Sequence, residues 1–252
     1  MTTRHVRARA ARVGVGLAVT LTGLVGLPMA WSSPAFARVN CHAAPSPGIN
    51  LRDCSLVNVD LSGANLSGAK LIHANLSGAN LSGAKLTGAT IVDANFANAN
   101  LTRAKLVKAN LFGTILTNAD LTKAKLDGAD LAKADLSGAD VLRADLKDAQ
   151  LAMADLNDAK LVDSKLIEAT LTNATLTSTH FEGAALIGAN LSGANLTDAS
   201  LFKAKLLHAN LSGANLSKAT LVHANLTGAN LSGVIWTGAA CPNGSIAGPS
   251  GC

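Results

Sequence analysis

The residues that could carry acid–base or metal chemistry lack the spacing that such chemistry needs. Ten of the 16 acidic residues lie within 120–163, where several recur at intervals of five. A general acid and base pair needs two carboxyl groups at a fixed separation across a cleft, so this pattern predicts a solvated acidic belt instead. The histidines show neither metal-ligand spacing nor a Ser–His–Asp or Cys–His arrangement. We therefore expect a protein that is not an enzyme, with no catalytic residue, metal or other cofactor.

A five-residue repeat covers most of the chain and therefore determines where most side chains lie. A large residue, nearly always Leu, stands at every fifth position from Leu51 to Trp236, giving 38 units without an insertion or deletion. Two residues before each lies a smaller residue, nearly always Ala. A period of five fits neither an α-helix nor a strand. It requires a backbone that turns once per unit and sends two side chains of each unit into a shared core.

The recurring phrase of the repeat is Ala-Asn-Leu-Ser-Gly, as at 64–68, 74–78 and 229–233. This A-(N/D)-L-x-x pattern resembles the pentapeptide-repeat family over about three quarters of the chain. The resemblance implies an all-β protein, a right-handed quadrilateral parallel β-helix of about nine to ten coils, each made of four pentapeptides. Leu and Ala would point inward and the other three residues of each unit would face solvent. The expected segments after residue 37 are an N-terminal capping segment at 38–50, the β-helix at 51–238 and a C-terminal capping tail at 239–252.

Four cysteines lie near the two ends of the repeat and are expected to form disulfides: Cys41, Cys54, Cys241 and Cys252. If four units make one coil, the repeat is roughly 45 Å long at about 4.8 Å per coil. The Cα atoms of a disulfide lie within roughly 7 Å of each other. Only the pairs Cys41–Cys54 and Cys241–Cys252 can then form within one chain. Each would tie an irregular segment over an open end of the β-helix; a metal site is the disfavoured alternative.

Residues 1–37 have the composition of a secretory signal peptide. Four arginines and no acidic residue precede an apolar stretch at 13–27, and Ala35-Phe36-Ala37 follows. The stretch is shorter than the roughly 20 residues of a membrane-spanning helix, so we expect cleavage after about Ala37 and a secreted, extracellular protein rather than a membrane anchor. Removal of the four arginines leaves 17 Lys and Arg against 16 Asp and Glu. This near-neutral balance gives no argument for nucleic-acid binding.

Residues 20 apart stack on one another if four units make a coil, and one corner then carries nine of those 17 basic residues. We call this corner the basic ridge; it comprises Lys85, Arg103, Lys105, Lys123, Lys125, Arg143, Lys165, Lys203 and Lys205. Only Asp145 and Asp163 interrupt it with acid. The ridge could bind an acidic polymer, a membrane surface or a protein partner. The alternative is a solvated edge that prevents aggregation.

Outward apolar residues also stack in two columns, and contiguous apolar surface suggests contact sites. One column comprises Ile72, Val92 and Phe112, and the other comprises Ile167, Ile187 and Leu207. Either column could support self-association, for example as a homodimer. The alternative is drift of the repeat without a function.

These features predict a secreted, non-catalytic scaffold that binds an unknown protein or an anionic envelope polymer through its outer faces. A filled axis leaves no cavity for a small-molecule substrate. One alternative follows from the resemblance: some family members mimic duplex DNA and bind topoisomerases, although those are acidic, cytosolic rods. The other alternative is binding to an ordered surface such as ice or a crystalline polymer. It rests on a hydroxyl column of Ser77, Thr117, Ser137, Thr177, Thr197, Ser217 and Thr237.

Overall fold

The computed structural model describes residues 39–248 and 251–252. The chain divides into two compact units, Met1–Arg38 and Val39–Cys252, and the described residues belong to the second. The signal peptide predicted for 1–37 lies outside the described residues. Within the described part of the chain, no helix has the length and apolarity needed to cross a bilayer.

Each pentapeptide of the repeat forms one β-turn followed by a single bridging residue. In the unit that begins at Leu101, the N–H of Ala104 donates to the carbonyl oxygen of Leu101 over 2.9 Å, which closes the turn. The third residue of this turn, Arg103, has a φ of 58°, and a positive φ recurs at every fifth position from Gly48 to Gly238. Side chains branched at Cβ fit this conformation poorly. No Val, Ile or Thr occupies any of these positions.

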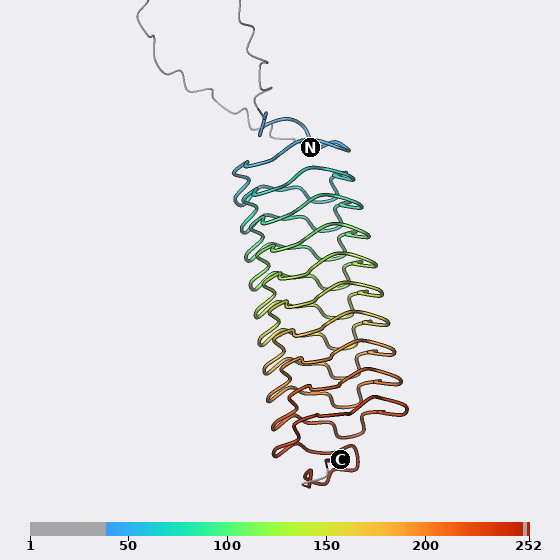
Figure 1. Cartoon of the computed structure of the whole chain (residues 1–252). Coiled ribbons are helices and arrows are strands. Elements are labelled where there is room, and N and C mark those ends of the chain that lie inside the picture. Colours follow the sequence, from blue (N-terminus) through green and yellow to red (C-terminus); the bar gives the residue numbers. More distant parts are fainter. Residues whose placement is uncertain (1–38, 249–250) are drawn as a thin grey trace, which may run out of the picture. The chain divides into compact units, whose positions relative to one another are not determined.

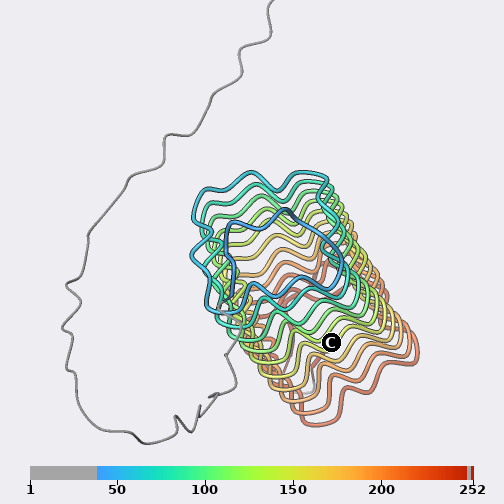
Figure 2. The ribbon, with the colours of Figure 1, turned by 90° about the horizontal axis from the view of Figure 1, so that it is seen from above.

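The repeats wind into coils of four pentapeptides. Parallel bridges join residues 20 apart throughout the repeat, from Asn50↔Lys70 to Thr220↔Ala240. The coils stack directly on one another, as the views from the side and from above show (Figures 1 and 2). Backbone hydrogen bonds run between successive coils: Leu101 donates to the carbonyl of Asp120 over 2.7 Å. Residues 20 apart therefore lie next to each other, as the sequence predicts.

The described residues contain no helix and no strand longer than one bridging residue. The expected parallel β-helix is therefore built from isolated bridges and turns. The reason is local, since a new turn with positive φ begins directly after each inward Leu and interrupts the extended backbone. The only antiparallel bridges among these residues, Ala240↔Ile246 and Gly248↔Gly251, belong to the C-terminal tail.

The core consists of the inward Leu and Ala columns. Leu101, Leu121 and Val141 follow one another at intervals of one coil and are 0–1% exposed. Phe96 and Phe181 are the largest fully buried side chains and replace Leu at the same inward position. Each buried Leu contributes roughly 2 kcal/mol of hydrophobic stabilisation, which requires that neighbouring coils cover both of its sides.

Both ends of the repeat carry a pair of cysteines with the geometry of a disulfide. The Cα–Cα distances are 5.5 Å for Cys41–Cys54 and 5.4 Å for Cys241–Cys252. The second pair holds the tail against the last units. There the tail passes close to the Trp236 indole, since a Cβ on Gly251 would lie 2.7 Å from Trp236 Nε1. Glycine at this position allows the close approach.

Candidate functional site: the basic ridge

The basic ridge consists of two parallel columns at one corner of the coils. Lys85, Lys105 and Lys125 occupy the bridging position in three consecutive coils, where parallel bridges join Lys85↔Lys105 and Lys105↔Lys125. The spacing between bridged neighbours is about 4.8 Å, so the three lysines form a continuous column. All three side chains are exposed. Asp145, Lys165 and Lys205 lie further along the same column.

The second column of the ridge lies at the turn position with positive φ. Arg103, Lys123 and Arg143 have φ values of 58°, 60° and 55°. Each of these turns also donates its third N–H to the next coil, as Lys123 does to the carbonyl of Leu142 over 2.8 Å. The turn therefore holds the backbone of each basic residue at the corner while its side chain extends into solvent. Lys203 continues this column two coils beyond Asp163.

Ion pairs divide the ridge into a neutralised part and an unpaired part. Arg143 Nε lies 3.7 Å from Asp163 Oδ2. Lys165 Nζ lies 3.8 Å from Asp145 Oδ2. The two acidic residues that interrupt the ridge in sequence therefore pair with ridge cations. Among the described residues, no carboxylate oxygen lies within 4.0 Å of the other seven basic groups of the ridge. Lys203 and Lys205 lie apart from the rest, beyond the ion pairs. The five that lie on three consecutive coils are called the unpaired part and comprise Lys85, Arg103, Lys105, Lys123 and Lys125.

A surface recess adjoins the unpaired part of the ridge. It is lined by Ser82, Gly83, Asn100, Thr102, Arg103, Thr122 and Lys123. Ser82, Thr102 and Thr122 are 20 residues apart and therefore form a column of hydroxyl groups beside the cations. Thr102 Oγ1 donates to Asn100 Oδ1 over 2.8 Å, which leaves its lone pairs free to accept. The sequence analysis missed this column, although the 20-residue spacing of hydroxyl residues beside Arg103 and Lys123 could have revealed it.

The two apolar columns are less exposed than the sequence analysis assumed. Ile72, Val92 and Phe112 are half-buried, and so are their counterparts Ile167, Ile187 and Leu207. Lys133 Nζ also lies 5.4 Å from the centre of the Phe112 ring and covers part of it. The more exposed large apolar residues of the described chain are Val57, Ile115, Met153, Ile235 and Ile246, which are 41–67% exposed. Partial burial is common at this turn position, where Ser82 and Thr102 are also half-buried, so the two columns remain a proposed contact site.

Five of the ten acidic residues of the predicted belt accept a hydrogen bond from the backbone. Asp130 and Asp155 lie at bridging positions, where each Oδ1 accepts a hydrogen bond from the backbone N–H two residues later. This Asx turn stabilises the start of the following β-turn. The N–H of Ser62 likewise donates to Asp60, and this bond lowers the pKa of that carboxyl below its ordinary value. The recurrence of Asp at intervals of five thus has a structural cause.

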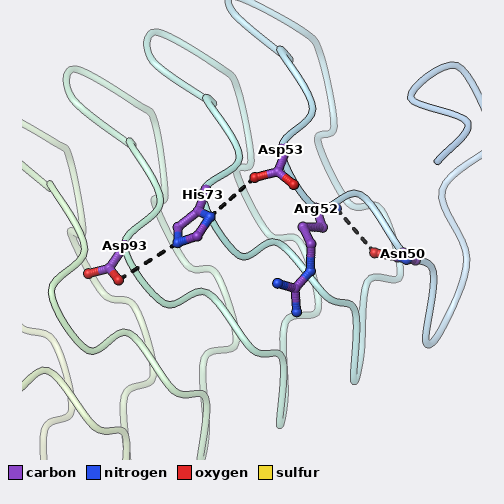
Figure 3. A network of polar contacts seen from close by, with 5 residues as sticks. All are labelled: Asn50, Arg52, Asp53, His73 and Asp93. Atoms are coloured by element: carbon purple, nitrogen blue, oxygen red, sulfur yellow. Dashed lines mark hydrogen bonds and ion pairs between the residues drawn. The ribbon is translucent and has the colours of Figure 1, made fainter. Parts of the chain in front are cut away.

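One histidine lies between two carboxylates, one on the preceding coil and one on the following coil (Figure 3). His73 Nδ1 lies 3.1 Å from Asp53 Oδ1, and His73 Nε2 lies 3.9 Å from Asp93 Oδ2. All three side chains are more than half exposed. The described residues contain no group of three or more His, Cys, Asp or Glu side chains arranged to hold a metal ion. The sequence analysis overlooked this stack, whose signal is the 20-residue spacing of its members.

Comparison with known proteins agrees with this architecture. The family model for pentapeptide repeats matches residues 48–151 and 154–233. One similar solved structure is that of HetL, a pentapeptide repeat protein from the cyanobacterium Nostoc sp. strain PCC 7120. HetL is involved in heterocyst differentiation regulation. Its sequence is 37% identical to this chain, and the two structures superpose with a TM-score of 0.65. The match covers 81% of this chain and 91% of HetL.

Further solved structures are more distant or match a shorter segment. A pentapeptide repeat protein from the Arabidopsis thaliana thylakoid lumen is 32% identical over 45% of this chain and 66% of its own, with a TM-score of 0.22. QnrB1, a plasmid-mediated fluoroquinolone resistance protein, is 19% identical over 76% of this chain and 90% of its own, with a TM-score of 0.41. No protein with a curated function matches the sequence. The matched repeats and the likeness to HetL show that the chain belongs to the pentapeptide-repeat family.

Proposed function

We propose that this protein is an exported, non-catalytic scaffold that binds a partner through the outer faces of a right-handed β-helix of nine to ten coils. One observation carries the proposal: the interior is filled. Leu101, Leu121 and their equivalents are 0–1% exposed in coil after coil. A small-molecule substrate normally binds in a concave, largely buried pocket. A partner would therefore bind to the outward side chains of the stacked coils.

The partner that we propose is a protein or an anionic polymer of the cell envelope. HetL is involved in the regulation of differentiation. That role is HetL's own. It supports the proposal only in that a repeat protein can regulate a process by binding another molecule. Export rests on the composition of residues 1–37, where a positive start and a short apolar run precede Ala35-Phe36-Ala37. Sequencing the N-terminus of the protein recovered from the culture medium tests export, and a start near Arg38 is expected.

Two alternatives are weaker on physical grounds. A mimic of duplex DNA must present a dense negative surface, whereas residues 38–252 carry 17 basic and 16 acidic residues, and the ridge is positive. An ordered surface such as ice requires hydroxyl groups that are free to match a lattice. In the hydroxyl column, Ser137, Thr197 and Ser217 instead donate to Asp135, Asn195 and Asn215 over 2.6–2.7 Å.

Site-specific photo-crosslinking in the producing cell tests the proposed function. A photoreactive amino acid would replace Lys105, Asn110, Ile115 or Asp120, which are the bridging residues on the four sides of one coil. We expect one side to give a discrete adduct with the same partner in repeated experiments. The control is the same substitution at Asn243 in the exposed tail. If none of the four sides gives an adduct more specific than the adducts of the control, the protein does not bind a partner through this coil.

A further inference from the structure

The cations in the unpaired part of the basic ridge are stacked in register, whereas solubility requires only that charges lie on the surface. Its five cations lie on three consecutive coils, and the bridges place Lys85, Lys105 and Lys125 directly above one another. Like charges placed directly opposite on adjacent strands destabilise a sheet. Bridged pairs of like charge also occur at Asp120↔Asp140 and Asp135↔Asp155, but among the described residues only the lysine column places three like charges at consecutive bridging positions. Some other charges are paired along their column. In the column of Asp140, for example, Lys160 Nζ lies 2.9 Å from Asp140 Oδ1.

We propose that the unpaired part of the ridge binds a linear acidic polysaccharide that carries one carboxylate per sugar and runs along the stack of coils. This inference rests on the proposed function and identifies the partner of one corner. The lysine column offers one cation per coil at a rise of about 4.8 Å. A polyuronate carries one carboxylate on each sugar, so a chain that runs along the stack can bring carboxylates to the cations of several coils.

The recess beside the cations favours a ligand that carries hydroxyl groups as well as charges, as an acidic sugar does. The basic residues Arg103 and Lys123 line the recess together with three hydroxyl residues, which are Ser82, Thr102 and Thr122. A polyuronate presents hydroxyl groups and carboxylates side by side on each unit. The guanidinium of Arg103 can bind a carboxylate through two parallel hydrogen bonds. The hydroxyl of Thr102 donates to Asn100, so its free lone pairs can accept hydrogen bonds from the hydroxyl groups of the sugar.

Nucleic acid fits this corner less well. Duplex DNA carries one charge per roughly 1.7 Å of its axis, which is denser than the two columns, since these offer at most two cations per coil at a rise of about 4.8 Å. Proteins that bind single strands add aromatic side chains on which the bases stack. None of the residues that line the recess is aromatic, and neither are the three lysines of the column.

The binding experiment compares the full chain with two triple variants of equal charge. The ridge variant carries Arg103→Asn, Lys105→Asn and Lys123→Asn. The control variant carries Lys70→Asn, Lys133→Asn and Lys218→Asn, which lie away from the ridge. Asn suits both positions, because native Asn residues occupy bridging sites such as Asn65 and positive-φ sites such as Asn118. The ligands are polygalacturonate, its fully methyl-esterified form, duplex DNA and anionic phospholipid vesicles.

We expect the parent to bind polygalacturonate in a salt-dependent manner and to ignore the esterified polymer. The ridge variant should bind at least about tenfold more weakly, and the control variant less than about twofold more weakly. Three results would overturn the inference: no binding of polygalacturonate by the parent, equal losses in both variants, or binding of DNA or vesicles as tight as that of polygalacturonate. In each of these cases a partner found by crosslinking at another side of the coil would still support the proposed function.

Discussion

Thr114 Oγ1 donates a 2.8 Å hydrogen bond to the carbonyl oxygen of Ile91 in the preceding coil, inside the core of the protein. Thr114 stands at an inward position that Ala occupies in most units, and it is 0% exposed. Thr179 repeats the same bond to the carbonyl of Leu156. A buried hydroxyl is costly without a partner, so these bonds explain how a polar residue replaces Ala in the core.

Replacement of Thr114 by Val should lower the free energy of unfolding by about 1 kcal/mol, because the shape is kept and one buried hydrogen bond is lost. The carbonyl of Ile91 retains the N–H of Ala94 at 3.3 Å, which limits the loss. The control is Thr117→Val at an outward position. Urea denaturation of both variants measures the difference. An equal midpoint for Thr114→Val and the parent would show that the hydroxyl does not contribute to stability.

The positive φ of the turns predicts which side chains they tolerate. Met153 has a φ of 58° and is 55% exposed, so few contacts depend on its side chain. A β-branched residue fits this conformation worse than the unbranched Met does, whereas Asn adopts it readily. Met153→Val should therefore lower the melting temperature by several degrees, and Met153→Asn should leave it unchanged or raise it. Calorimetry that places the Val variant level with the Asn variant would contradict this account of the turns.

The two cysteine pairs predict where unfolding starts. Residues near Leu51 and Leu226 have covering coils on one side only, whereas Leu131 is covered on both. Because each bridge restrains the segment that covers an end, reduction should accelerate amide hydrogen exchange at the ends before the middle. Exchange would be measured with and without reductant, with the paired replacement of Cys41 and Cys54 by Ser as a second test. A uniform loss of protection along the repeat would contradict the capping role.

The ion pair between Lys160 and Asp140 predicts a pH dependence at the alkaline end. The hydrogen bond to Asp140 and the attraction of its charge raise the pKa of Lys160 above the ordinary value of 10.5. A raised pKa in the folded state stabilises the protein fully below the unfolded pKa, and this stabilisation is lost as the pH rises through the folded pKa. In Asp140→Asn, an NMR titration should show a lower pKa for Lys160. An unchanged pKa would mean that the pair does not persist in solution.

The sequence predicts the fold well because one rule repeats. The inward positions are fixed by Leu and Ala at a period of five, and the 20-residue register places Lys85, Lys105 and Lys125 in one column, as the bridges do. The ion pairs of Arg143 and Lys165 were not predictable in the same way, since they depend on side-chain rotamers. The shielding of Phe112 by Lys133 is likewise a matter of side-chain conformation. The repeat thus predicts which residues stack on one another. It does not predict which of their side chains pair or cover each other, because that depends on side-chain conformation.

The lysine column predicts a local destabilisation that salt or a ligand should relieve. Lys105 lies between Lys85 and Lys125, and no carboxylate oxygen of the described residues lies within 4.0 Å of its ammonium group. Removal of this charge in Lys105→Asn should raise the melting temperature at low ionic strength by about 1 °C. The gain should shrink at 1 M salt, where the Debye length is about 3 Å. Lys70→Asn, which removes the same charge from another side, should show no such gain; an equal gain there would mean that the relief comes from net charge and not from the column.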